Sequence, residues 1–133
     1  MVSRHIKGHT VSKGQGTGNA LVCTEPISFL GGIDPETGII LKGECKGKSV
    51  AGKVLVFPSG MGSTVGSYVI YQMAKNGVAP CAIINLETEP IVAVGAVISG
   101  IPLIDKLEEN LFDVIHDGDK VLVDASKGYI EVQ

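Results

Sequence analysis

The sequence predicts one α/β domain, in which a β-rich first half packs against a strand–helix–strand layer as a mixed sheet or closed barrel with helices outside. Three observations lead to this prediction. The chain has 133 residues, a usual size for one domain, so we expect 1–133 to fold as a single unit. Its 44% hydrophobic content is too high for a disordered chain, despite 18 glycines. Its second half contains a buried strand, a helix and another buried strand in succession.

The first half of the chain is typical of strands separated by turns. Residues Val2–Val11 predict a strand that enters a glycine-rich bend at Lys13–Gly18, and Asn19–Thr24 predicts a short apolar strand. A turn is expected at Asp34–Gly38, because proline fixes φ and glycine accepts a positive φ. Ile39–Leu41 is expected to form a short or edge strand. This half therefore contributes mainly strands.

The second half supplies the strand–helix–strand unit. Lys53–Phe57 is a continuous apolar run bounded by Gly52 and Pro58, which is the pattern of a buried strand. A helix is predicted from about Thr64 to Asn76, and a second buried strand at Pro80–Leu86. Strands joined in this way are expected to be parallel, with a right-handed crossover.

The C-terminal part predicts a helix, a strand, a helical turn and a hairpin. Pro90–Ser99 allows a strand or a short helix, and its place between two predicted strands favours the helix. Ile101–Ile104 predicts the next strand, and Asp105–Leu111 a short amphipathic helical turn. Lys120–Asp124 and Tyr129–Val132 predict the two strands of a closing hairpin.

Composition and charge make several classes of protein unfavourable. The net charge is −3 and no basic run stands out, so we expect no nucleic-acid partner. The longest apolar stretch, Ile91–Ile98, is far shorter than the ~20 residues that span a bilayer, and no signal-peptide pattern precedes it. We therefore expect no membrane partner and a cytoplasmic location. Cys23, Cys45 and Cys81 are widely spaced, which predicts reduced thiols rather than a disulfide framework or a self-contained metal site.

The segment Val56–Tyr68 carries the most chemical information in the chain. It leaves a buried strand and enters a helix, and it contains glycines and hydroxyl side chains. Glycines let backbone N–H groups approach a ligand, and a helix N-terminus adds free donors and partial positive charge. These features suit a phosphate or carboxylate oxygen, and the candidate substrate-binding residues are Ser59, Gly60, Gly62 and Thr64. A plain turn in which Ser63 caps the helix accounts for the same residues, and the sequence leaves both interpretations open.

Other motifs give weaker predictions. The Val56–Tyr68 segment lacks the Gly-Lys-Ser/Thr ending of a P-loop and the Gly-x-Ser-x-Gly of a hydrolase elbow. The glycine cluster Gly14–Gly18 precedes a strand rather than a helix, so we do not expect dinucleotide binding. His5 and His9 share a face of the predicted N-terminal strand, but no third ligand is evident beside them, and we predict no metal site.

Four segments, distributed over nearly the whole chain, match a known family. They are GNALV at Gly18–Val22, PISFLGGIDPETG at Pro26–Gly38, FPSGMGSTVGSYVIY at Phe57–Tyr71 and DGDKVLVDASKGYIEV at Asp117–Val132. Together they resemble the small swivel subunit of the aconitase X family. The resemblance implies a swivelling β/β/α domain like the mobile fourth domain of aconitase. It also implies a heterodimer with a large aconitase X-type subunit that holds a 4Fe-4S cluster, while this chain alone binds none.

The resemblance also implies an activity. A short stand-alone chain of this kind implies the small subunit of a two-chain hydro-lyase. That enzyme dehydrates (R)-5-phosphomevalonate to trans-anhydromevalonate 5-phosphate in an archaeal mevalonate route to isoprenoids. In such enzymes a serine of the swivel domain accepts the proton, and the motif gives this role to Ser63. Family members often carry arginine where this chain has Met61, so the larger subunit is expected to compensate for the missing cation.

The sequence leaves two alternative functions open and disfavours a third. The chain could belong to an aconitase X-type dehydratase that acts on another hydroxy acid, since most of the pocket would lie on the other chain. It could also be a non-catalytic swivelling binding module. A phosphohistidine swivelling domain is not favoured, because it needs a histidine after the loop and this chain has Ser63–Val65 there.

Overall fold

The computed structural model describes residues 3–133. Within that range, eight strands form one mixed sheet in the order β1-β10-β9-β3-β5-β7-β8-β2. Their bounds are β1 Arg4–Lys7, β2 His9–Ser12, β3 Gln15–Val22, β5 Val54–Phe57, β7 Ala82–Asn85, β8 Leu103–Asp105, β9 Lys120–Asp124 and β10 Tyr129–Val132. Strands β3, β5, β7 and β8 pair in parallel, and the remaining pairs are antiparallel. A separate parallel pair joins β4 (Ile27–Ser28) to β6 (Gly60–Met61).

The large sheet bends round until it is nearly closed. Strands β1 and β2 stand at the two ends of the strand order, yet Gly8 alone separates them in the chain. Gly8 N donates to Gly128 O at 3.0 Å, and a Cβ at Gly8 would lie 2.5 Å from Ile104 Cγ2. The strand predicted at Val2–Val11 is therefore broken at this glycine, because β1 continues one end of the sheet and β2 the other. The start of that prediction, Val2, lies outside the described residues.

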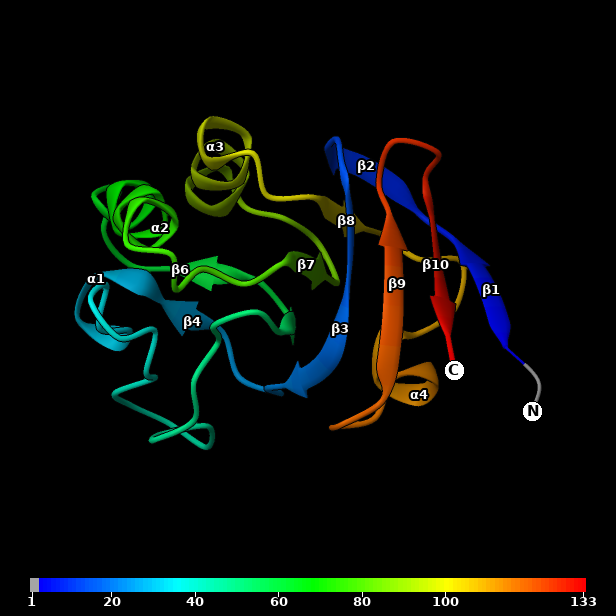
Figure 1. Cartoon of the computed structure of the whole chain (residues 1–133), viewed down its shortest axis with the longest axis horizontal. Helices are drawn as coiled ribbons and strands as arrows, with labels where there is room; N and C mark the ends of the chain where they lie inside the picture. The colour runs from blue at the N-terminus through cyan, green and yellow to red at the C-terminus, as the bar shows by residue number, and fades with distance from the viewer. Residues whose placement is uncertain (1–2) are drawn as a thin grey trace.

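Helices cover the sheet on two sides. In residues 3–133 they are α1 Phe29–Gly32, α2 Gly66–Lys75, α3 Pro90–Ser99 and α4 Leu111–Val114. Of these, α1 is a kinked turn, because Leu30 and Gly31 have non-helical backbone angles. Helices α2 and α3 pack side by side, away from α4 (Figure 1). Side chains alternate along β5: Leu55 and Phe57 join the core beneath α2 and α3, while Val54 and Val56 join the core that contains α4 residues. None of the described helices is long and apolar enough to cross a membrane.

The predicted α/β class is confirmed, and several elements match closely. The prediction was correct for β5, β7, α3, β9 and β10, although some strands are shorter than expected. The glycine-rich bend is instead largely part of β3, where a Cβ at Gly16 would lie 2.4 Å from Cys81 O. The helical turn predicted at Asp105–Leu111 lies later, at α4, because the Asn110 side chain caps that helix by accepting from Phe112 N at 3.0 Å. The short strand expected at Ile39–Leu41 is not formed: Ile39 and Ile40 make isolated bridges only.

Candidate functional site

The segment between β5 and α2, residues 58–65, leaves the carboxyl end of a buried strand and crosses to the helix. We call it the site loop. Pro58 O accepts a hydrogen bond from Leu86 N at 3.1 Å, and Ser59 O accepts one from Ile27 N at 3.1 Å. β6 then pairs with β4, after which residues Gly62–Val65 are exposed. Backbone hydrogen bonds therefore fix the first part of this site loop, whereas its last part faces solvent.

Gly60, which the sequence suggested as a substrate-binding residue, is buried and faces α3. A Cβ at this position would lie 2.4 Å from Glu89 Oε1 and 2.5 Å from Val92 Cγ2. The Glu89 carboxylate caps α3 by accepting from Ile91 N at 3.0 Å and Val92 N at 2.7 Å. Glycine at position 60 thus leaves room for a helix cap, which is a contact that no local sequence pattern reveals.

Gly62 occupies a position that only glycine adopts easily. Its φ is +90°, and a Cβ there would lie 2.5 Å from Ser28 Oγ on β4. The Ser28 hydroxyl itself donates to Leu30 O at 3.2 Å. The conformation and the close contact both require glycine. They also place Ser28, which sequence reasoning missed, directly against the site loop.

Ser63 and Thr64 are exposed at the entrance to α2. Ser63 Oγ accepts a hydrogen bond from Val65 N at 3.2 Å, and Ser63 O accepts one from Gly66 N at 2.9 Å. The helix begins at Gly66 rather than at Thr64, so Ser63 forms a turn before the helix and is not its N-cap residue. The structure therefore brings Gly62, Ser63 and Thr64 together beside the positive end of α2, with Ser59 half-buried behind them.

A cavity of about 280 Å³ lies beside the site loop. Met61 and Ser28 line it, together with residues from the segment between β3 and β5. Met61 is exposed and brings no charge, and Lys42 is the one cationic side chain that lines the cavity within residues 3–133. Sequence reasoning did not single out Lys42, because it lies in an irregular segment with no recognisable motif.

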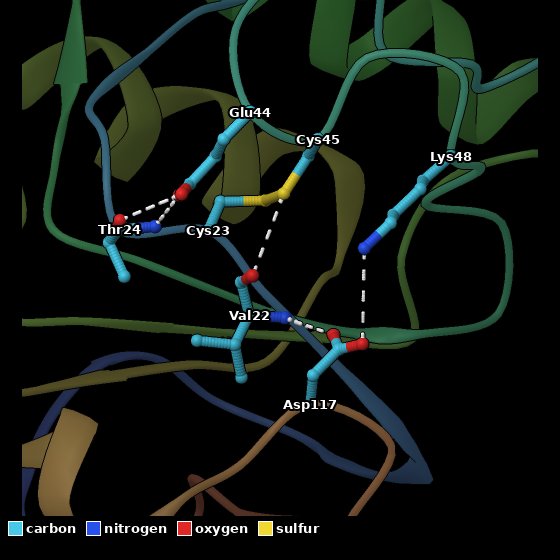
Figure 2. A network of polar contacts seen from close by, with 7 residues as sticks. All are labelled: Val22, Cys23, Thr24, Glu44, Cys45, Lys48 and Asp117. Carbon is cyan, nitrogen blue, oxygen red and sulfur yellow. Dashed lines mark hydrogen bonds and ion pairs between the residues drawn. A yellow bond between two sulfur atoms is a disulfide. The ribbon is translucent and has the colours of Figure 1, made fainter.

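The wall of this cavity contains a disulfide between Cys23 and Cys45, whose Cα atoms are 6.1 Å apart (Figure 2). This corrects the expectation that all three cysteines are reduced thiols. The two residues are 22 positions apart in sequence, with Cys23 directly after β3 and Cys45 in a later turn. The return of the chain toward β3 brings them together, and no local Cys-x-x-Cys spacing announces it.

Polar contacts surround the disulfide (Figure 2). The Glu44 carboxylate accepts a hydrogen bond from Thr24 N, and Thr24 Oγ1 lies 2.8 and 2.9 Å from its two oxygens. These hydrogen bonds from Thr24 lower the pKa of Glu44 below its ordinary value, because they favour the charged carboxylate. Asp117 Oδ1 accepts from Val22 N at 3.0 Å, and Asp117 Oδ2 lies 4.0 Å from Lys48 Nζ. The segment that carries the cavity wall is thus tied to the end of β3.

The third cysteine and the histidines stand apart from the site loop. Cys81 is half-buried just before β7, and burial raises the pKa of its thiol. His5 stacks on Tyr129 with ring centroids 4.3 Å apart, whereas His9 Nδ1 lies 2.8 Å from Asp105 Oδ1. The break between β1 and β2 therefore separates two histidines that the sequence placed on one face. Within residues 3–133, no group of three His, Cys, Asp or Glu side chains is arranged to hold a metal ion.

The sheet is mixed and nearly closed, and a glycine- and hydroxyl-rich loop follows the carboxyl end of one of its parallel strands. This is the architecture expected of a swivelling β/β/α domain. The profile of the Aconitase X swivel domain matches residues 5–132, and the chain belongs to this family. The crystal structure of Thermococcus kodakaraensis aconitase X in its holo-form has the same fold, with a TM-score of 0.92. That structure is 48% identical, and the match covers 98% of each chain.

Curated relatives are similar over nearly their whole length. A protein of Methanosarcina acetivorans named phosphomevalonate dehydratase small subunit is 60% identical, over 99% of this chain and 93% of its own. A protein of the same name from Methanocella arvoryzae is 60% identical, over 96% of this chain and 98% of its own. The equivalent protein of Archaeoglobus fulgidus is 55% identical, over 92% and 93% of the two chains.

Proposed function

We propose that this chain is the small subunit of a two-chain dehydratase that converts (R)-5-phosphomevalonate to trans-anhydromevalonate 5-phosphate. In this proposal Ser63 accepts the proton, and Ser59, Gly62 and Thr64 border the bound substrate. The observation that carries the proposal is the exposed Ser63 beside the N-terminus of α2, in a chain similar from end to end to proteins named phosphomevalonate dehydratase small subunit. The proposal places the assembled enzyme in the cytoplasm, with no nucleic-acid or membrane partner.

The chemistry assigned to this chain is a proton transfer. The C–H bond beside the substrate carboxylate breaks, its proton goes to Ser63 Oγ, and its electron pair forms the new double bond as the neighbouring C–O bond breaks. The hydroxyl group leaves as hydroxide, and a Lewis-acidic group of the larger subunit would accept it. A serine is a weak base in its neutral form, so it must act as an alkoxide. Val65 N–H, 3.2 Å from Ser63 Oγ, and the positive end of α2 both favour negative charge there. Met61 adds no cation to the loop, and the proposal assigns further stabilisation of the alkoxide to the larger subunit.

The proposal assigns the family's 4Fe-4S cluster to the larger subunit, because the cysteines of this chain do not fit one. Cys23 and Cys45 are bonded to each other, and Cys81 is half-buried beside β7. Three free thiolates facing one point, the donor set of such a cluster, are therefore not available here. What this chain contributes is the site loop and its proton acceptor.

The test is Ser63→Ala in the complex with the larger subunit, assayed anaerobically with (R)-5-phosphomevalonate. Turnover should fall by about 10²–10⁴-fold, the usual contribution of a positioned base, while subunit association is retained. Ser67→Ala is the matched control: its hydroxyl donates to the backbone oxygen Thr64 O at 3.0 Å, and its loss should leave turnover within about twofold. Wild-type turnover in Ser63→Ala would remove the assignment.

A panel of hydroxy acids distinguishes the remaining alternatives. Dehydration of a different hydroxy acid, with no turnover of phosphomevalonate, would keep the dehydratase class and change the substrate. Absence of any turnover in a stable complex would favour a non-catalytic binding module. The phosphorylated substrate itself should be preferred over its dephosphorylated form, because the site loop suits an anionic ligand.

A further inference from the structure

We infer that the outward face of α3 is an apolar docking surface for the larger subunit. This face consists of Val94, Val97 and Ile98, spaced as neighbours on one side of the helix. The inference rests on the proposed function, because it takes the larger subunit as the occupant. It adds to that function the place where the two chains are held together, away from the reacting atoms.

The exposure of this face is unusual for a surface helix. Val94, Val97 and Ile98 are each between 52 and 57% exposed, and no residue of α3 is charged. The neighbouring helix α2 differs, since its exposed residues include Gln72 and Lys75. A helix that is apolar on all sides is normally buried, so the outward side of α3 lacks the cover that its composition calls for.

The fold does not need these side chains for its own core. The opposite side of α3 already supplies Val92, Gly95 and Ala96 to the interior. A Cβ at Gly95 would lie 2.6 Å from Ile70 Cδ1, so α2 and α3 are in close contact there. The three outward side chains therefore contribute little to folding, and their apolar character requires another explanation.

The position of α3 identifies its occupant. Glu89 lies against Gly60 of the site loop, and a Cβ at Gly66 would lie 3.1 Å from Ile91 Cγ2, so α2 and α3 both begin beside the loop (Figure 1). Ile91 lies one helical turn before Val94, so the apolar face of α3 begins beside the loop that, in the proposed function, meets the active site of the other chain. Met61, Val65 and Tyr68, in the loop and at the start of α2, are further exposed apolar side chains near Ser63 in the chain. A second copy of this chain seated on this surface would cover Met61, Val65 and Tyr68, whereas the larger subunit can contact these side chains and the loop together.

The experiment uses the double variant Val94→Glu/Val97→Glu. Both positions are more than half exposed, and glutamate has a higher helix propensity than valine, so the free chain should keep its circular dichroism spectrum and Tm. Its Kd for the larger subunit, measured anaerobically by calorimetry, should rise by about tenfold or more, because two carboxylates would be buried in an apolar contact. Leu41→Glu is the matched control, because Leu41 is another exposed apolar residue. It belongs to the segment between α1 and β5, which runs on the side of β4 and β6 away from α3 (Figure 1).

Each outcome decides the inference. Weaker binding by the double variant with an unchanged Kd for Leu41→Glu supports it. An unchanged Kd for the double variant, or an equal loss in the control, overturns it. A third outcome also overturns the inference in favour of self-association: the free wild-type chain dimerises, while the double variant is monomeric and binds the larger subunit normally. If the wild-type complex forms but dehydrates nothing, the proposed function fails while the docking surface stands.

Discussion

At the scale of single residues, the two glycines of the site loop serve different purposes. Gly62 has a positive φ and lies against Ser28, so both its conformation and its surroundings exclude a side chain. Gly60 is limited by packing, because the carboxylate that caps α3 and the side chain of Val92 occupy the space where its Cβ would be. Neither glycine is explained by ligand approach alone, although Gly62 is exposed and stays in the proposed site. A Gly/Ser-rich loop in a sequence therefore does not distinguish ligand contact from internal packing.

Replacing Gly60 tests this packing role. Gly60→Ala should lower the free energy of unfolding by about 1–3 kcal/mol, because the new methyl group would force the Glu89 cap and Val92 apart. Gly32→Ala is the control, because a Cβ added at Gly32 would come no closer than 4.0 Å to Ser28 Cβ and the φ of Gly32 is not positive. Its free energy of unfolding should change by no more than about 0.5 kcal/mol. Urea unfolding of both variants measures the difference. Equal stability of the two variants would contradict the packing role.

At the scale of elements, the sequence predicts the regular half of the chain well and the irregular half poorly. The apolar runs of β5 and β7 are buried on both faces, and such runs are recognisable without any knowledge of partners. The strand break at Gly8 and the glycines of β3 are different, since they are explained by backbone and side-chain approaches from strands distant in sequence. The Cys23–Cys45 disulfide is also unpredictable from spacing, because it depends on how the segment before β5 folds back.

The disulfide should stabilise the segment between β3 and β5, which consists mainly of turns and isolated bridges. A crosslink that closes a loop with a sequence separation of 22 removes conformational freedom from the unfolded chain, which is worth roughly 3 kcal/mol. Cys45→Ser, or treatment of the wild type with a phosphine reductant, should therefore lower Tm by several degrees in scanning calorimetry. In Cys81→Ser the reductant should still lower Tm, whereas in Cys45→Ser it should have no further effect. A wild-type Tm that is indifferent to reductant would show that the crosslink does not stabilise the fold.

At the scale of the whole molecule, the topology gathers the functional elements at one edge. The carboxyl ends of the parallel strands β5 and β7 lead into the site loop and the turn before α3, so the two helices that follow both start there. The parallel pairing of β5 and β7 on either side of α2 follows from general rules of chain connection. Closure of the sheet cannot be predicted from such rules, because it depends on two short strands, β1 and β2, that pair with opposite ends of the sheet.

The arrangement of the three cysteines leads to a prediction about the isolated chain. Two of them form a disulfide and the third is half-buried with a raised pKa, so they cannot together offer three thiolates to an iron–sulfur cluster.

The chain purified alone, under anaerobic conditions and with iron and sulfide supplied, should remain colourless and should not dehydrate phosphomevalonate. Under the proposed function, activity should appear only on mixing with the larger subunit, which would bring the remaining groups of the site while this domain would close over them with Ser63. Because reduction could free Cys23 and Cys45, the reconstitution should be repeated after reductant treatment. The same colourless result is expected, since Cys23 and Cys45 belong to one core cluster and Cys81 packs against the other. A stable brown protein with stoichiometric iron, in either state, would show that the cluster belongs to this chain and would move the active site away from the interface proposed here.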